Sequence, residues 1–304
     1  MKNQAGWLRL SDALLLAVAA VWGSTYAVVK STLVFYSVLG VLALRFGLAF
    51  VLLLPALRGL RALPRSSVWG ALGCGAVLFG IFLAETFGVM LTEASTAAFL
   101  ISLCVVLTPW AEWALLHRRP ARKEWVAAAL SLVGAWLLSG AGARLQAGDA
   151  LILLAALLRA LHGCVMKRVM RDARLTPTML TAVQSGVVAG GGAIAALAAG
   201  QWGPLPAWPS QDGFWVGMAY LALVCTVFAF FVQSFAMQRS HPTRVSLLMG
   251  SEPAFGALVA CLWLGERLTP LAWLGGALMV GVSLWAVLPG GARPGPAQGS
   301  SMPA

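Results

Sequence analysis

The most regular feature of this sequence is a series of apolar runs, each about twenty residues long, separated by short polar connections. A helix crosses a hydrocarbon core of ~30 Å in about 20 residues, so each run is long enough to span a bilayer. The pattern predicts an all-α integral membrane protein with ten transmembrane helices. Their expected bounds are 12–30, 35–57, 68–91, 96–116, 124–141, 149–167, 177–199, 212–237, 243–263 and 270–288.

Composition supports the membrane interpretation. Hydrophobic residues make up 60% of the 304-residue chain and charged residues only 10%, whereas a soluble domain carries about 25% charged residues. The outer shell of a soluble fold must face water, and a chain of this composition has too few polar side chains to cover it. A lipid-facing shell removes that difficulty.

Basic residues are distributed unevenly among the predicted connections. With the N-terminus in the cytoplasm, sixteen Lys and Arg residues fall on the cytoplasmic side and three on the other. This asymmetry follows the positive-inside rule and predicts a protein of the inner or plasma membrane with both termini cytoplasmic. The net charge of +11 is therefore explained by topology, and we expect no nucleic-acid partner.

An internal repeat is visible in the apolar pattern. The letters D-A-L-L-L-A-V-A-A begin at Asp12, and D-A-L-I-L-L-A-A-L begins at Asp149. We expect one five-helix repeat over 11–141 and a second over 148–288, followed by a disordered cytoplasmic tail over 289–304. Because five is odd, the second repeat must enter the membrane from the opposite side. Inverted repeats of this kind recur in secondary transporters, where a central site opens to alternate faces.

Several motifs together resemble those of the EamA family, within the drug/metabolite transporter superfamily. They are A-V-W-G-S-T-Y-A-V-V-K at 20–30, A-L-R-F at 43–46, A-A-F-L-I-S-L-C-V-V-L-T-P at 97–109, R-A-L-H at 159–162, H-P-T-R-V-S-L-L-M-G-S-E-P at 241–253 and L-G-E-R-L-T-P at 264–270. The resemblance implies a ten-span permease that moves amino acids, other small metabolites or toxic compounds, often outward. It also implies a central cavity formed mainly by the first, third, fourth, sixth, eighth and ninth spans. Arg159 departs from the family pattern, which usually has Trp at that position.

Ionisable residues inside the predicted spans are the first candidates for a site, because each costs at least ~2.5–3.5 kcal/mol to insert. Glu85 either binds a substrate amino group or a proton, or forms a salt bridge to Arg159 or Arg45. Arg159 and His162 lie three residues apart and share a helix face. They either bind substrate, with His162 sensitive to protonation, or form a packed polar cluster with Glu85.

Further candidates lie in other spans. Arg45 and Gln184 occupy similar depths in the second and seventh spans, and provide either an anion contact or a structural clamp onto neighbouring carbonyls. Pro109 and Pro253 each remove a backbone donor, so we expect helix kinks beside the central site. Glu252 precedes Pro253 and either contributes to the site or caps the kink.

Aromatic and amide side chains complete the expected cavity. Trp22, Tyr26 and Gln233 are candidates to line it, although a Trp within a span serves more often in packing. Glu112 lies near the cytoplasmic end of its span, and we expect it to pair with the basic cluster at 118–123.

The predicted function is secondary transport of small metabolites, such as amino acids or related amphiphilic compounds, by alternating access. The sequence has no nucleotide-binding or hydrolase motif, and its five cysteines lie inside apolar runs, so we expect no enzyme activity, cofactor or metal. The expected partners are a small-molecule substrate, an optional coupling proton and the lipid bilayer, with the protein a monomer or weak homodimer. The alternatives are an intramembrane enzyme acting on a lipid-linked substrate and a channel or scramblase.

Overall fold

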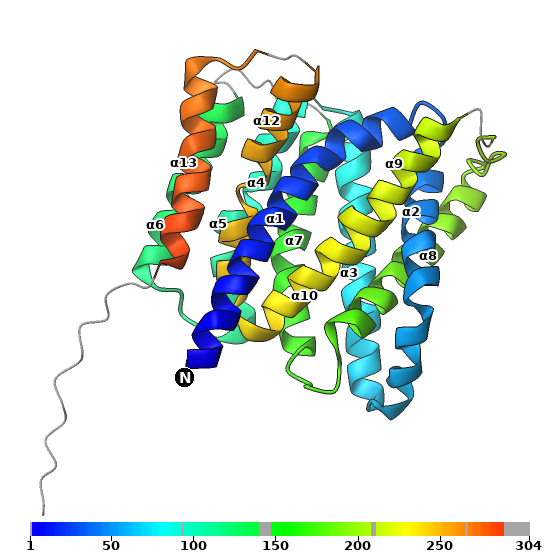
Figure 1. Ribbon diagram of the computed structural model, residues 1–304, viewed down its shortest axis with the longest axis horizontal. Coiled ribbons are helices and arrows are strands. Elements are labelled where there is room, and N and C mark those ends of the chain that lie inside the picture. Colours follow the sequence, from blue (N-terminus) through cyan, green and yellow to red (C-terminus); the bar gives the residue numbers. More distant parts are fainter. Residues whose placement is uncertain (1, 93, 140–146, 208–210, 265–266, 289–304) are drawn as a thin grey trace, which may run out of the picture.

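The computed structural model describes residues 2–92, 94–139, 147–207, 211–264 and 267–288. Helices joined by short turns make up this part of the chain, which contains no strand (Figure 1). In the first half they are α1 (Lys2–Thr32), α2 (Val38–Leu53), the 3-10 helix η1 (Leu54–Ala62), α3 (Arg65–Met90), α4 (Ala94–Ser102), α5 (Cys104–Leu116) and α6 (Arg122–Ser139). The predicted tail at 289–304 lies outside the described residues.

The second half continues in the same way, with one π-helix, η2. Its elements are α7 (Asp149–Val169), α8 (Pro177–Ala198), α9 (Asp212–Ala222), η2 (Leu223–Phe228), α10 (Ala229–Arg239), α11 (Pro242–Met249), α12 (Glu252–Leu264) and α13 (Pro270–Val287). Several of these helices begin where the sequence provides a cap. Thr176 and Thr269 each accept a backbone N–H of the first turn, and Pro177 and Pro270 follow them directly, an arrangement that favours helix initiation.

Long apolar helices confirm the membrane class. Among the described residues, six helical stretches are long and apolar enough to cross a bilayer, and two shorter ones, Leu10–Thr25 and Pro270–Ala286, are also apolar. The six are Val38–Ala62, Arg65–Gly88, Phe99–Leu116, Asp149–Val169, Pro177–Ala198 and Asp212–Arg239.

Three of the predicted continuous spans are interrupted in the structure. Leu103 separates α4 from α5, Gly250 and Ser251 separate α11 from α12, and η2 lies between α9 and α10. Pro109 lies inside α5, after the interruption, and Pro253 is the second residue of α12. A proline lacks the N–H that continues the helical hydrogen-bond ladder. The interruptions at Leu103 and at Gly250–Ser251, however, come before Pro109 and Pro253 in the sequence.

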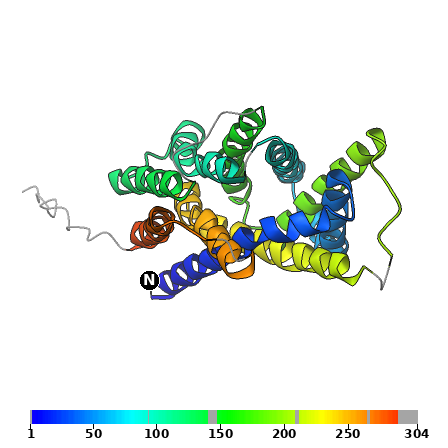
Figure 2. The ribbon, with the colours of Figure 1, turned by 90° about the horizontal axis from the view of Figure 1, so that it is seen from above.

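The two halves of the chain pack into one body. α2 packs along α8, α6 along α13, α3 along α7 and α8, and α1 along α12. Viewed from above, the α6–α13 pair lies at one end of the bundle and the α2–α8 pair at the other (Figure 2). The main apolar core also mixes both halves: Leu15 and Cys74 lie with Met166, Leu180 and Leu248. Residues of both halves therefore pack together in the same hydrophobic core.

A close backbone approach between α6 and α13 yields a first prediction. A Cβ atom added at Gly275 would lie 2.5 Å from the carbonyl oxygen of Gly134, whereas one added at Gly281, on the same helix, meets nothing within 4 Å. Gly275→Ala must push the helices apart, and we expect it to destabilise the protein by about 1–3 kcal/mol. Thermal unfolding in detergent should show a lower Tm for Gly275→Ala than for the matched control Gly281→Ala. Equal melting temperatures would contradict the packing described.

Candidate functional site

A cavity of about 120 Å³ lies among helices from both halves. A single water occupies about 10–15 Å³ on this measure, so the cavity has room for several waters or a small solute. Its walls are largely apolar, with a few convergent polar groups, as is typical of a ligand site. The lining includes the predicted residues Trp22, Arg45, Glu85, Arg159, His162, Gln233, Glu252 and Pro253.

The centre of this site is an arginine shared by two carboxylates. Nη2 of Arg159, on α7, lies 2.9 and 3.1 Å from the two carboxylate oxygens of Glu85, on α3. Nη1 of Arg159 donates to Oε2 of Glu252, on α12, over 3.2 Å. The guanidinium carbon also lies 5.8 Å from the centre of the Trp22 ring. Glu85 comes from the first half of the chain and the other two charged residues from the second, so this cluster joins the halves.

Arg45 makes the contacts expected of a structural clamp. It is only 4% exposed, and its Nε donates to Oγ1 of Thr226 over 2.8 Å, while Nη2 donates to the carbonyl of Cys225 over 3.2 Å. Both acceptors belong to η2, where the π-helical turn breaks the regular ladder. Trp22 Nε1 donates to the same Cys225 carbonyl over 3.0 Å. Arg45 thus holds the irregular turn beside the cavity, while its anion-contact role stays a prediction.

Two buried polar atoms among the cavity residues have no hydrogen-bond partner within the described part of the chain. They are Nε2 of His162, a residue that is 3% exposed, and Oε1 of Gln233. Buried polar atoms nearly always find a partner, so these two atoms are exceptions among the residues of the cavity wall. Gln184 lies outside the cavity lining and donates to the Cys74 sulfur over 3.3 Å. Tyr26 belongs to α1, but its side chain lies outside the described part.

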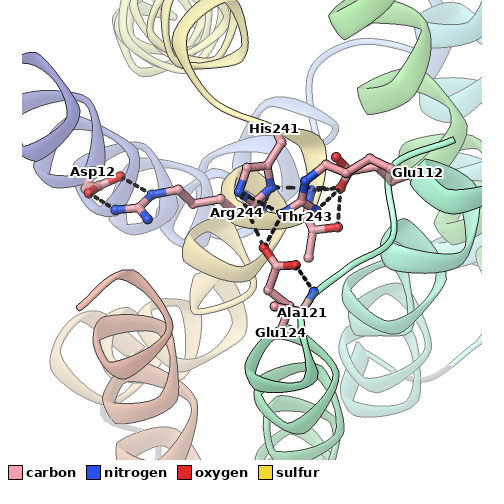
Figure 3. A network of polar contacts seen from close by, with 8 residues as sticks. Asp12, Glu112, Ala121, Glu124, His241, Thr243 and Arg244 are labelled. Atoms are coloured by element: carbon pink, nitrogen blue, oxygen red, sulfur yellow. Dashed lines mark hydrogen bonds and ion pairs between the residues drawn. The ribbon is translucent and has the colours of Figure 1, made fainter. Parts of the chain in front are cut away.

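A second polar cluster lies at the end of the bundle where α5 ends and α11 begins (Figure 3). The Glu112 side chain is 1% exposed, and its Oε2 accepts the backbone N–H of Thr243 over 3.0 Å and also the Thr243 hydroxyl. Nη1 of Arg118 lies 3.2 Å from the same oxygen. Glu112 therefore pairs with the basic cluster as expected, and it also reaches across to the second half of the chain.

Two further carboxylates belong to this cluster. Glu124 accepts from Nη2 of Arg118 over 2.7 Å and lies 3.4 Å from Nε2 of His241. Asp12 pairs with Arg244, with N–O distances of 2.6 and 3.1 Å (Figure 3). His241 lies in the turn between α10 and α11, where burial, followed by the nearby Arg118 charge, lowers its pKa to about 4. The imidazole is therefore neutral at pH 7.

Sequence reasoning did not find this second cluster as a unit. Its members are charged or polar residues near the ends of predicted spans, where such residues are ordinary. Asp12 and Arg244 are 232 positions apart, and no local periodicity relates them. The motif beginning at His241 was the one available signal, because it places three polar residues at a helix start.

The profile of the EamA-like transporter family matches this chain twice, over residues 9–140 and 146–288. The chain belongs to the EamA-like transporter family. The resemblance read from the sequence motifs is thus confirmed. Its EamA relatives are named as transporters rather than as enzymes.

Two relatives match most of this EamA-family chain. An uncharacterized transporter of Archaeoglobus fulgidus is 28% identical over 279 residues, covering 89% of this chain and 83% of the relative. YedA of Escherichia coli strain K12, an uncharacterized inner membrane transporter, is 27% identical over 285 residues, with coverages of 90% and 88%. A solved crystal structure with 19% sequence identity superimposes with a TM-score of 0.75. The match covers 91% of this chain and 98% of the chain in that structure. The fold is therefore one already seen by crystallography.

The shared arginine yields a second prediction. Arg159→Gln leaves Glu85 and Glu252 close together without their common cation. The Arg159 side chain is partly buried, at 21% exposure, so the loss should lie below the about 3–5 kcal/mol typical of a fully buried ion pair. We expect a lower Tm in detergent at pH 7. The control is Arg174→Gln, which removes an exposed pair to Asp172 within one loop and should change Tm little, because water screens such pairs. Equal losses of Tm in the two variants would contradict the role given to Arg159.

Proposed function

We propose that this protein is a secondary transporter of small metabolites, such as amino acids or related amphiphilic compounds. It works by alternating access at the cavity between two inverted five-helix repeats. The observation that carries the proposal is the cluster of Glu85, Arg159 and Glu252, which faces a central cavity and is contributed by both halves. A charge cluster at this depth is costly, and a polar solute in transit gives it a function.

The helix pairing supports the inverted repeat over 11–141 and 148–288. Each of the five proposed spans of the first repeat has an equivalent in the second: span one corresponds to span six, two to seven, and so on. Exchanging equivalent spans turns each of the following helix contacts into another observed contact. The α2–α8 and α6–α13 pairs each join equivalent spans, and the α3–α7 packing corresponds to the packing of α1 on α9 and α10. The α5–α7 packing likewise corresponds to that of α1 on α12. Interruptions at Leu103 and at Gly250–Ser251 fall in the equivalent fourth and ninth spans.

The topology follows from the charge distribution. Sixteen basic residues against three favour an orientation with both termini cytoplasmic in the inner or plasma membrane. The name of YedA as an inner membrane transporter agrees with that location. An intramembrane enzyme is disfavoured by the family, whose matched members are named as transporters.

Counterflow in proteoliposomes tests the proposal and yields a third prediction. Candidate substrates come from a thermal-shift screen of the purified protein, because a ligand that binds the folded state raises Tm. We expect saturable uptake of a labelled hit, accelerated by unlabelled hit inside the vesicles. A channel or scramblase would give flux that neither saturates nor shows counterflow.

Variants link transport to the cavity. Arg159→Gln and Glu85→Gln each remove one charged group of the proposed solute site. A charge-assisted contact to the solute is worth about 1.5–3 kcal/mol, so each variant should lose about tenfold or more in transport rate. If Glu85 takes up a coupling proton, Glu85→Gln also abolishes the pH dependence of uptake. Arg174→Gln is the surface control and should transport normally. Unchanged rates and pH dependence in both cavity variants would remove these residues from the site.

A further inference from the structure

The polar cluster of Figure 3, here called the end network, connects the two halves of the chain. It consists of Asp12, Glu112, Arg118, Glu124, His241, Thr243 and Arg244. Its bridging contacts join residues 232, 131 and 123 positions apart in the sequence. These contacts therefore resist any motion that separates the halves at this end.

The end network holds the beginning of one short helix, α11. The first N–H groups of a helix have no intrahelical partner, and the helix dipole attracts anions there. Glu112 takes the Thr243 N–H and hydroxyl. His241 Nδ1 accepts the Arg244 N–H over 3.3 Å, and His241 Nε2 lies 3.1 Å from Nη2 of Arg118 and 3.4 Å from Oε1 of Glu124. Two carboxylates of the first half thus bind the start of a second-half helix.

The same helix forms part of the cavity wall. Val245, Ser246 and Met249 of α11 line the cavity, and Thr108 Oγ1 on α5 donates to Ser246 Oγ over 3.1 Å. At its other end α11 is separated from α12 by the interruption at Gly250–Ser251. The polar contacts at its first turn and the interruption at Gly250–Ser251 thus delimit α11 as a separate short helix of the cavity wall.

We propose that the end network is a gate of the transport cycle, and that its contacts hold α11 against α5 and close the cavity toward this end. When the contacts break, α11 moves away from α5 and the cavity opens to the aqueous face there, which is the cytoplasm in the proposed orientation. The inference rests on the proposed alternating access. The residues act by positioning a helix and do not themselves contact the transported solute.

Thiol labelling of a native cavity residue tests the gate and is a fourth prediction. Cys104 lines the cavity, so it serves as the reporter in a background where Cys74, Cys164, Cys225 and Cys261 are replaced by Ala. A membrane-impermeant maleimide is added from the cytoplasmic face of oriented membrane vesicles. We expect slow labelling in this background and about tenfold faster labelling in Asp12→Asn and Glu112→Gln, as for a loss of about 1.4 kcal/mol from the closed state.

A charge swap separates gating from general damage. Asp12→Arg alone should label fast, because it places two cations together, and Asp12→Arg combined with Arg244→Asp should restore slow labelling by re-forming the pair. Arg174→Gln breaks an ion pair contained in one loop and should leave labelling slow. Thermal unfolding in detergent shows whether each variant is folded. If Glu112→Gln does not fold, the Asp12–Arg244 charge swap alone tests the gate.

The outcomes are distinct from those of the transport assay, since labelling needs no substrate. Labelling at the background rate in folded Asp12→Asn and Glu112→Gln, or failure of the swap to slow it again, overturns the gate even if counterflow is observed. Gated labelling without counterflow for any solute would leave the gate in place and overturn the transport proposal.

Discussion

A buried charge must be neutralised by a partner, and this requirement organises the molecule around Arg159. Its partly buried guanidinium lies between Glu85 and Glu252, and the attraction between such charges is stronger beside low-dielectric protein than in bulk water. The three residues come from α3, α7 and α12, so satisfying one charge fixes the relative positions of three helices. The cavity lies where these three helices meet others from both halves.

The same requirement explains where the helices are irregular. A helix can lose its hydrogen-bond ladder at membrane depth only where protein or a wet cavity supplies other partners. In η2 the Cys225 carbonyl accepts from both Trp22 and Arg45. The interruption at Gly250 and Ser251 adjoins the cavity, and the Ser251 hydroxyl donates to the Leu248 carbonyl over 2.8 Å. Irregular backbone and functional side chains are therefore found together.

Two polar clusters at different depths give the bundle two connections between its halves. The central cluster faces the cavity, and the end network lies where α5, α6 and α11 meet Asp12 of α1. Both connections depend on charge-assisted hydrogen bonds, which are directional and break over short displacements. The polar contacts therefore add directional constraints to those that helix packing already imposes.

The sequence alone determined the membrane class, the approximate positions of the helices and the family, because hydropathy, charge bias and motifs are local properties of the chain. It also raised the Glu85–Arg159 salt bridge and the Arg45 clamp as alternatives, and the structure has both contacts. Only the tertiary structure placed Glu252 on the same arginine, left Gln184 outside the cavity and brought Asp12 to Arg244. Those outcomes depend on how helices far apart in sequence cross one another. Crossing is decided by the summed packing of whole helix faces, including approaches such as Gly134 to Gly275, which no single segment encodes.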